Sequence, residues 1–134
     1  ESQSVSLREE MEFASAYIFL LKMRFENNLQ FDIQIAKSFE DYRLPPMAVQ
    51  VLIENAVKHN EISDRKPLTI HIVTNNEGYL SISNDIQPKR TAASGTGIGL
   101  VNLAKRYRLL FKQDIQITED KEFSVCIPLI DELQ

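Results

Sequence analysis

The segment over residues 44–60, LPPMAVQVLIENAVKHN, constrains the fold most, because it combines a helical pattern with polar residues that the pattern does not require. Pro45 and Pro46 suit the start of a helix, where a missing N–H costs little. The apolar residues that follow recur at helical spacing: Val49, Leu52, Ile53, Ala56 and Val57. This spacing predicts an amphipathic helix around which the rest of the chain is organised.

One side of this predicted helix carries Asn55, Lys58 and His59. An amide oxygen can ligate a hard cation, and the two neighbouring donors can meet phosphate oxygens, so the group suits a metal-bound phosphate. A second interpretation needs no ligand, because Glu54 and Lys58 are spaced to form a solvent-exposed ion pair. The helix alone leaves both interpretations open.

A glycine-rich segment over residues 94–111, SGTGIGLVNLAKRYRLLF, favours the phosphate interpretation. Gly95, Gly97 and Gly99 directly precede an amphipathic run, and such a turn offers free N–H groups and a helix N-terminus to an anion. The pattern alone is weak, since hairpins use the same residues. It is neither a P-loop, which would continue into G-K-[ST], nor a dinucleotide fingerprint, which would follow a buried strand.

Together the two segments resemble the N box and the second glycine box of the histidine-kinase ATPase domain, and most closely those of the LytS-type sensor kinases. The segment SLREEMEFASAYIFLLKMRF also resembles the stretch that precedes the ATPase core in that group. The resemblance implies a Bergerat-type ATP-binding fold with ATP and Mg²⁺ as cofactors. By resemblance Asn55 ligates the magnesium ion, Lys58 and His59 contact phosphate oxygens, and Glu54 either orients a water on Asn55 or pairs with Lys58. The implied phosphate cradle is Gly95, Thr96, Gly97, Ile98, Gly99 and Leu100.

The family's first glycine box, D-x-G-x-G, is missing. The strand that should lead into it ends in Asn84 and Asp85, so Asn84 takes the place of the adenine-binding aspartate, or Asp85 serves instead. An amide oxygen accepts the adenine hydrogen bond without charge assistance and therefore more weakly. The polar segment over residues 85–94 is then a candidate lid, from which Lys89 and Arg90 would reach phosphates or remain solvated charges.

The order of predicted elements is helix, strand, helix, strand, strand, helix, strand, strand. The fold class is therefore an α/β (α+β) two-layer sandwich, with a mixed, largely antiparallel sheet and helices on one face. Residues 1–28 are predicted to link to an absent upstream region, and residues 29–134 to form the ATPase domain. The first helix, from Leu7 to about Phe25, begins with a Ser6–Glu9 capping box and is apolar on two sides. The second stripe (Phe13, Tyr17 and Leu20) faces either an absent upstream segment or this domain's own sheet.

The net charge of −4 argues against a nucleic-acid partner, and a single cysteine suits a reducing cytoplasm. His59 lies inside the ATP motif and His71 lies on a strand, so neither is the phosphoacceptor. The resemblance therefore implies that this chain is the catalytic domain of a histidine kinase, which phosphorylates a histidine on separate upstream helices. The resemblance implies a homodimeric, membrane-anchored bacterial sensor, with this domain in the cytoplasm and a response regulator as partner.

Two other functions remain open. A nucleotide-binding pseudokinase that signals without phosphotransfer would explain the missing first glycine box. An ATPase or serine kinase of the same superfamily is less well supported, because Val51 stands where the gyrase-like ATPases place their general-base glutamate.

Overall fold

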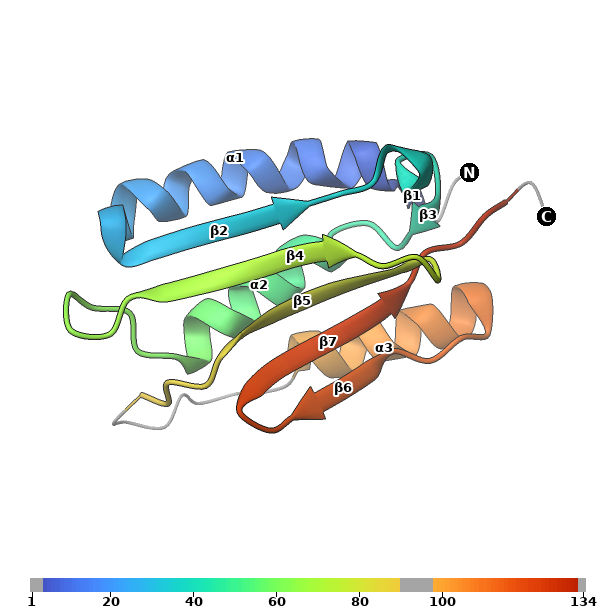
Figure 1. Cartoon of the computed structure of the whole chain (residues 1–134). Helices are drawn as coiled ribbons and strands as arrows, with labels where there is room; N and C mark the ends of the chain where they lie inside the picture. Colours follow the sequence, from blue (N-terminus) through green and yellow to red (C-terminus); the bar gives the residue numbers. More distant parts are fainter. Residues whose placement is uncertain (1–3, 90–97, 133–134) are drawn as a thin grey trace.

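A five-stranded sheet with helices on one side forms the body of the molecule (Figure 1). The computed structural model describes residues 4–89 and 98–132. The elements are β1 (Val5–Ser6), α1 (Leu7–Phe25), η1 (Glu26–Asn28), β2 (Leu29–Gln34), η2 (Lys37–Phe39), β3 (Arg43–Leu44), α2 (Ala48–His59), β4 (Leu68–Thr74), β5 (Tyr79–Asp85), α3 (Ile98–Phe111), β6 (Gln116–Glu119) and β7 (Glu122–Pro128).

The strand order is β2-β4-β5-β7-β6, in which β2 and β4 are parallel and the other neighbours are antiparallel. In Figure 1, α2 and α3 lie behind the sheet and α1 runs along β2. The predicted mixed, largely antiparallel sheet with helices on one face is therefore confirmed, as is the predicted order of its elements.

Alternation along the strands decides which side chains enter the core. In β5, Leu80, Ile82 and Asn84 are buried toward the helices, whereas Ser81 and Ser83 lie on the outer face. The largest fully buried side chains come from both layers: Leu7, Leu29, Leu44, Ile53, Leu68, Ile70, Ile72, Leu80, Leu103, Tyr107 and Ile127.

A second, two-stranded sheet was not predicted. β1 pairs with β3 in antiparallel register, with Val5 opposite Leu44. The sequence suggested a loop over residues 36–43, because strands of two residues are too short to show alternation.

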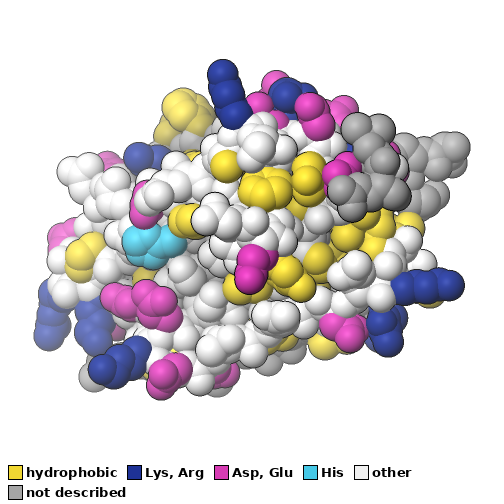
Figure 2. All heavy atoms as spheres, turned by 45° about the vertical axis from the view of Figure 1, so that its right-hand side comes forward, with side chains coloured by type: hydrophobic (Ala, Val, Ile, Leu, Met, Phe, Trp, Pro, Cys, Tyr) yellow, Lys and Arg dark blue, Asp and Glu magenta, His cyan; other side chains and the backbone are white. Residues whose placement is uncertain are grey.

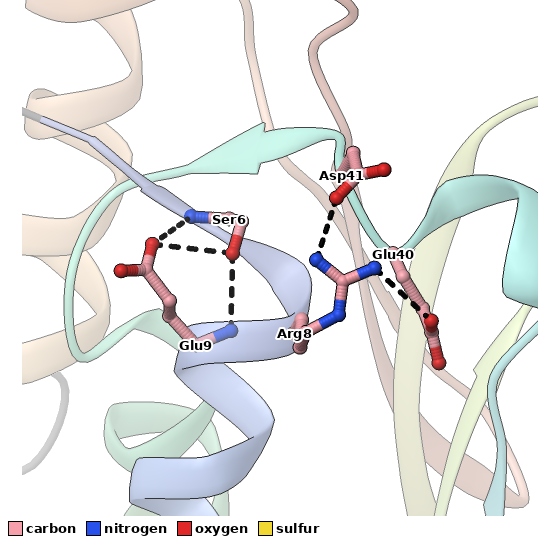
Figure 3. Close-up of polar contacts among 5 residues, drawn as sticks. All are labelled: Ser6, Arg8, Glu9, Glu40 and Asp41. Carbon is pink, nitrogen blue, oxygen red and sulfur yellow. Dashed lines mark hydrogen bonds and ion pairs between the residues drawn. The ribbon is translucent and has the colours of Figure 1, made fainter.

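The start of α1 is fixed by polar contacts, shown in Figure 3. The predicted capping box forms, since Ser6 Oγ accepts from the Glu9 N–H while Glu9 Oε1 accepts from the Ser6 N–H. Arg8 pairs with Asp41 at 2.6 Å and with Glu40 at 3.4 Å. These contacts tie the first turn of α1 to the segment before β3.

The two apolar stripes of α1 have different surroundings. The first stripe enters the core through Ala14, Ile18 and Leu21. In the second stripe Phe13 and Leu20 are exposed, whereas Tyr17 is half-buried and packs against the core. Only Tyr17 of that stripe is therefore buried against this domain.

Acidic and basic side chains are interspersed over the face drawn in Figure 2, which shows no continuous basic surface. Across residues 4–89 and 98–132, none of the helices combines the length and the apolar composition needed to span a bilayer.

Candidate functional site

The C-terminal half of α2 presents polar side chains that the fold itself does not use. Lys58 is exposed, and Asn55 and His59 are half-buried. None of these three side chains makes a hydrogen bond or ion pair to another residue in the described part of the chain. Glu54 and Lys58 do not form the ion pair that the alternative interpretation requires. The side chains are therefore available to a ligand.

Two adjoining cavities meet at these residues. The larger, of about 410 Å³, is lined by Asn55, His59, Asn60, Ile86, Pro88, Leu100, Glu119 and Phe123. The smaller, of about 280 Å³, is lined by Val51, Glu54, Asn55, Lys58, His59, Ile98, Gly99 and Leu100. Asn55, His59 and Leu100 line both, so one ligand can extend from the larger, less polar space into the smaller, more polar one.

The cavities bring together most of the predicted site residues that the structure describes: Glu54, Asn55, Lys58, His59, Ile98, Gly99 and Leu100. Lys89 lies apart, on a third cavity of about 480 Å³ between α1 and α2 that Lys58 and Arg24 also line. Gly95, Thr96 and Gly97 fall outside the described residues, as does Arg90.

The first turn of α3 packs closely against α2. A Cβ added to Gly99 would lie 3.4 Å from Val51 Cγ1, at van der Waals contact, so α3 begins directly beside α2. The N–H groups of the first turn of a helix have no partner within the helix, and the dipole favours negative charge there. Gly99 and Leu100, in this first turn, line the smaller cavity.

Asn84 and Asp85 lie on opposite faces of β5. Asn84 is 1% exposed and faces the helices, whereas Asp85 is exposed on the outer side. Asn84 Nδ2 donates to the Asp85 carbonyl at 2.7 Å, which leaves Oδ1 as the atom that can accept another hydrogen bond. Neither residue lines the two cavities directly.

Sequence reasoning missed the residues that connect α2 to the end of β5. Asn60 is buried, and its Oδ1 accepts from the Gln87 N–H at 2.7 Å while its Nδ2 donates to the Ala56 carbonyl at 2.8 Å. Gln87 Nε2 in turn donates to the Glu61 carbonyl at 2.9 Å. An asparagine directly after a helix was a usable signal, since such residues satisfy helix-end groups.

Glu119 and Phe123 were also missed as cavity residues. They come from β6 and β7 and reach the cavity only through the sheet pairing. No local pattern marks them.

The opposite end of α2 is held by a residue of α1. Met47, directly before α2, has a φ of 70° and provides no side-chain cap. Instead, the buried Glu10 carboxylate accepts from the Met47 and Val49 N–H groups, each at 2.9 Å. Burial raises the pKa of Glu10, although these N–H donors act in the other direction. On α3, Arg106 Nη1 donates to the Pro46 carbonyl at 2.6 Å, so three helices meet here.

The chain resembles parts of known sensor proteins. No protein-family model matches it. It is 33% identical over 136 residues to the sensor protein LytS of Streptococcus mutans, a match that covers 90% of this chain and 23% of LytS. It is 30% identical over 125 residues to LytS of Staphylococcus epidermidis, covering 82% of this chain and 21% of that protein. The sensor histidine kinase BtsS of Escherichia coli is 29% identical over 120 residues, covering 87% of this chain and 21% of BtsS. The chain thus spans about a fifth of the length of these curated relatives.

Several solved structures with the same fold are histidine kinases or their catalytic domains. The nucleotide-free catalytic domain of the histidine kinase ThkA superposes with a TM-score of 0.63 and 17% identity, covering 97% of this chain and 100% of that one. The mycobacterial sensor histidine kinase MprB gives a TM-score of 0.54 and 12% identity, covering 97% and 99%. At these identities the likeness establishes the fold, and it agrees with the predicted Bergerat-type architecture.

Proposed function

We propose that this chain, a relative of the LytS-type sensor kinases with the fold of a histidine-kinase catalytic domain, is the ATP-binding catalytic domain of such a kinase. One observation carries the proposal. Asn55, Lys58 and His59 are unpaired among the described residues and gather where two cavities meet the start of α3. This is the arrangement that a bound nucleoside triphosphate would complete.

The two cavities suit the two halves of ATP. The larger one is lined in part by Ile86, Leu100 and Phe123, which suits an aromatic base. The smaller one has Lys58 and His59 as side-chain donors, together with the first-turn N–H groups of Gly99 and Leu100, which suit phosphate oxygens. Asn84 Oδ1, on the helix-facing side of β5, is the acceptor we assign to the adenine amino group. Gly95, Thr96 and Gly97 would extend the cradle, and Lys89 would contribute from the lid.

Asn55 is the residue we assign to Mg²⁺. Its amide lines both cavities and makes no hydrogen bond of its own among the described residues. In this part of the chain no three His, Cys, Asp or Glu side chains cluster as they would to hold a metal ion alone. One amide oxygen with phosphates and waters fits Mg²⁺, which takes few protein ligands. Glu54, beside Asn55 on the smaller cavity, would orient one of those waters.

When bound, ATP supplies the phosphoryl group, and this chain supplies the residues that hold it. His59 lines the nucleotide site, and His71 Nδ1 lies 2.9 Å from Asp32 Oδ2 on the outer face of the sheet. We therefore assign the phosphoacceptor histidine to helices outside this chain. In the whole protein these helices would form the homodimer, a response regulator would accept the phosphoryl group, and a membrane anchor would hold this domain in the cytoplasm.

A second candidate function is a nucleotide-binding module that signals without phosphotransfer. The neutral Asn84 in place of an aspartate favours this alternative. The two functions can be distinguished by incubating a longer form of the protein, which includes the phosphoacceptor helices, with γ-³²P-labelled ATP. A kinase would incorporate the label, and a module without phosphotransfer would not.

Calorimetric titration with a non-hydrolysable ATP analogue tests the nucleotide site itself. We expect binding with Mg²⁺, weaker binding in EDTA, and an affinity loss of at least about tenfold in Asn55→Ala. Asn76→Ala is the matched control, because Asn76 is exposed in the β4–β5 turn, away from both cavities. Equal affinity in Asn55→Ala and in the unmodified chain would contradict the assignment of Asn55. Absence of binding up to about 1 mM nucleotide would contradict the proposed site.

A further inference from the structure

Two polar side chains, those of Asn84 and Glu119, lie on the helix-facing side of the sheet, at the end where the larger cavity is found. The register places Asn84 of β5 opposite Phe123 of β7, and Phe123 opposite Glu119 of β6. Residues directly opposite each other on neighbouring strands point to the same face of a sheet. Because Asn84 is buried toward the helices, Phe123 and Glu119 share that face.

Glu119 departs from the alternation that the neighbouring row of residues follows. All four residues of that row are apolar, and three of them are at most 3% exposed: Ile72, Ile82, Val125 and Ile117. Ile117 and Glu119 occupy equivalent positions of β6, where the pattern of the sheet calls for an apolar side chain. A departure from a local rule of this kind is expected where a residue serves function.

The larger cavity gives the Glu119 carboxylate a use. Glu119 lines this cavity together with Ile86, Leu100 and Phe123, and it does not line the smaller one. Its carboxylate makes no ion pair or side-chain hydrogen bond among the described residues. It is therefore a charged acceptor that a ligand of the larger cavity can reach.

We propose that Glu119 accepts hydrogen bonds from the ribose hydroxyls of the nucleotide. This assignment rests on the nucleotide site proposed above. Two neighbouring hydroxyl groups match the two oxygens of a carboxylate, and an acidic side chain contacts ribose in the same way in dinucleotide-binding folds. The phosphates do not suit Glu119, because like charges repel.

The position of Glu119 favours the ribose over the base. β6 is an edge strand of the sheet (Figure 1), and Glu119 is exposed. Asn84, the acceptor assigned to the adenine amino group, lies on the inner strand β5 and is 1% exposed. An aromatic base gains most from the buried side of a cavity, whereas a ribose, with its hydroxyls, suits the side that is open to solvent.

Calorimetric titration of the 134-residue chain with ADP, 2′-deoxy-ADP and 3′-deoxy-ADP, all with Mg²⁺, tests the assignment. We expect the unmodified chain to bind ADP about tenfold more tightly than either deoxy form, since each deoxy form leaves a charged acceptor without its donor. In Glu119→Ala this preference should fall below about twofold. ADP itself should bind about tenfold more weakly to Glu119→Ala than to the unmodified chain.

Glu122→Ala is the matched control. Glu122 lies on the same hairpin but opposite Asp85, on the outer face of the sheet, and it lines neither cavity. Both substitutions remove one negative charge, and that loss by itself favours an anionic nucleotide. Glu122→Ala should therefore keep the preference for ADP over its deoxy forms and should not weaken ADP binding.

Inosine diphosphate separates the ribose from the base, because it has the same ribose and lacks the adenine amino group. Glu119→Ala should leave the preference for ADP over inosine diphosphate unchanged. Loss of that preference, with the preference over the deoxy forms retained, would place Glu119 on the base and overturn the ribose assignment.

The titrations also separate this inference from the proposed function. Equal binding of ADP and its deoxy forms by the unmodified chain would overturn the role of Glu119 and leave the nucleotide site standing. Absence of binding by every nucleotide up to about 1 mM would overturn both. Circular dichroism of each variant shows whether it remains folded.

Discussion

The two ends of α2 differ in how their polar groups are satisfied. At the N-terminal end, the Met47 and Val49 N–H groups donate to the buried Glu10 carboxylate, and the Pro46 carbonyl accepts from Arg106. At the C-terminal end, Asn55, Lys58 and His59 make no such contacts among the described residues and line two cavities. The protein's own side chains satisfy the polar groups at the N-terminal end, and the C-terminal end is where we propose that the ligand binds.

This difference shows how a helix can carry a binding site without losing its position. Glu10 comes from α1 and Arg106 from α3, so contacts from both neighbouring helices fix α2 at the end opposite the proposed site. The side chains at the other end can then remain unpaired without freeing the helix to shift. Pre-organisation of this kind lowers the cost of binding.

The largest expected effect comes from removing Glu10, which anchors the N-terminal end of α2. Glu10→Ala leaves N–H groups at the start of α2 without an acceptor in a buried site, so we expect a loss of about 3 kcal/mol in the free energy of unfolding. Urea denaturation measures the loss. Glu12→Ala, at an exposed position of the same helix, should change stability by less than about 0.5 kcal/mol. A similar small change in Glu10→Ala would show that Glu10 does not anchor α2.

The anchor should also give stability a distinct pH dependence. Because burial raises the pKa of Glu10, the native state holds a proton that the unfolded state releases near pH ~4.3. Unfolding then releases a proton between that pH and the native pKa, so Glu10 makes the free energy of unfolding fall as pH rises through this window. Glu10→Gln lacks this slope. Urea titrations of both proteins from pH 4 to 8 measure the free energy of unfolding. The difference in this free energy between the two proteins should shrink as pH rises and then level off.

At the open end, function and stability should separate. Lys58 is exposed and unpaired among the described residues, so Lys58→Ala should change stability by less than about 0.5 kcal/mol. If Lys58 contacts phosphate, its removal should weaken binding of the ATP analogue about tenfold. Calorimetry measures the affinity, with Lys66→Ala as a control at an exposed loop position. A loss of stability with unchanged affinity would reverse the roles assigned to the two ends.

The other contact to the closed end should have an intermediate effect. Arg106→Met keeps the aliphatic part of the side chain but removes the donor to the Pro46 carbonyl. We expect a loss of about 1 kcal/mol by urea denaturation, the usual net value of one hydrogen bond. Lys105→Met is the control, because Lys105 is exposed on the same helix and its side chain makes no hydrogen bond or ion pair among the described residues. Equal effects of the two substitutions would show that Arg106 does not help to hold the N-terminal end of α2.

The same comparison explains what the sequence could predict. Asn55, Lys58 and His59 share one helix, so their spacing alone placed them together, and the long elements followed from periodicity. Glu10 and Arg106 act on α2 from positions 37 or more residues away along the chain. Glu10 resembles any first-turn glutamate, so its burial had no local signal. Glu119 and Phe123 were missed for the same reason, since only the pairing of β6 with β7 and of β7 with β5 brings them to the cavity.

The smallest expected effect concerns a carboxylate in the opposite situation from Glu10. Asp32, on the outer face of the sheet, accepts from Gln34 Nε2 and lies 2.9 Å from His71 Nδ1, and these contacts lower its pKa. The unfolded state then binds the proton more readily, so the contribution of Asp32 is present above pH ~3.9 and is lost as pH falls through its native pKa. The stabilising contribution of Asp32 therefore grows as pH rises, whereas that of Glu10 falls. Below about pH 4, Asp32→Asn should make the free energy of unfolding depend less on pH. Above that pH, where we assign the pH dependence to Glu10, the substitution should change nothing. If Asp32→Asn instead changed the pH dependence above about pH 4, that dependence would come from the exposed Asp32–His71 pair on the sheet. Buried Glu10, which anchors α2, would then not be its source.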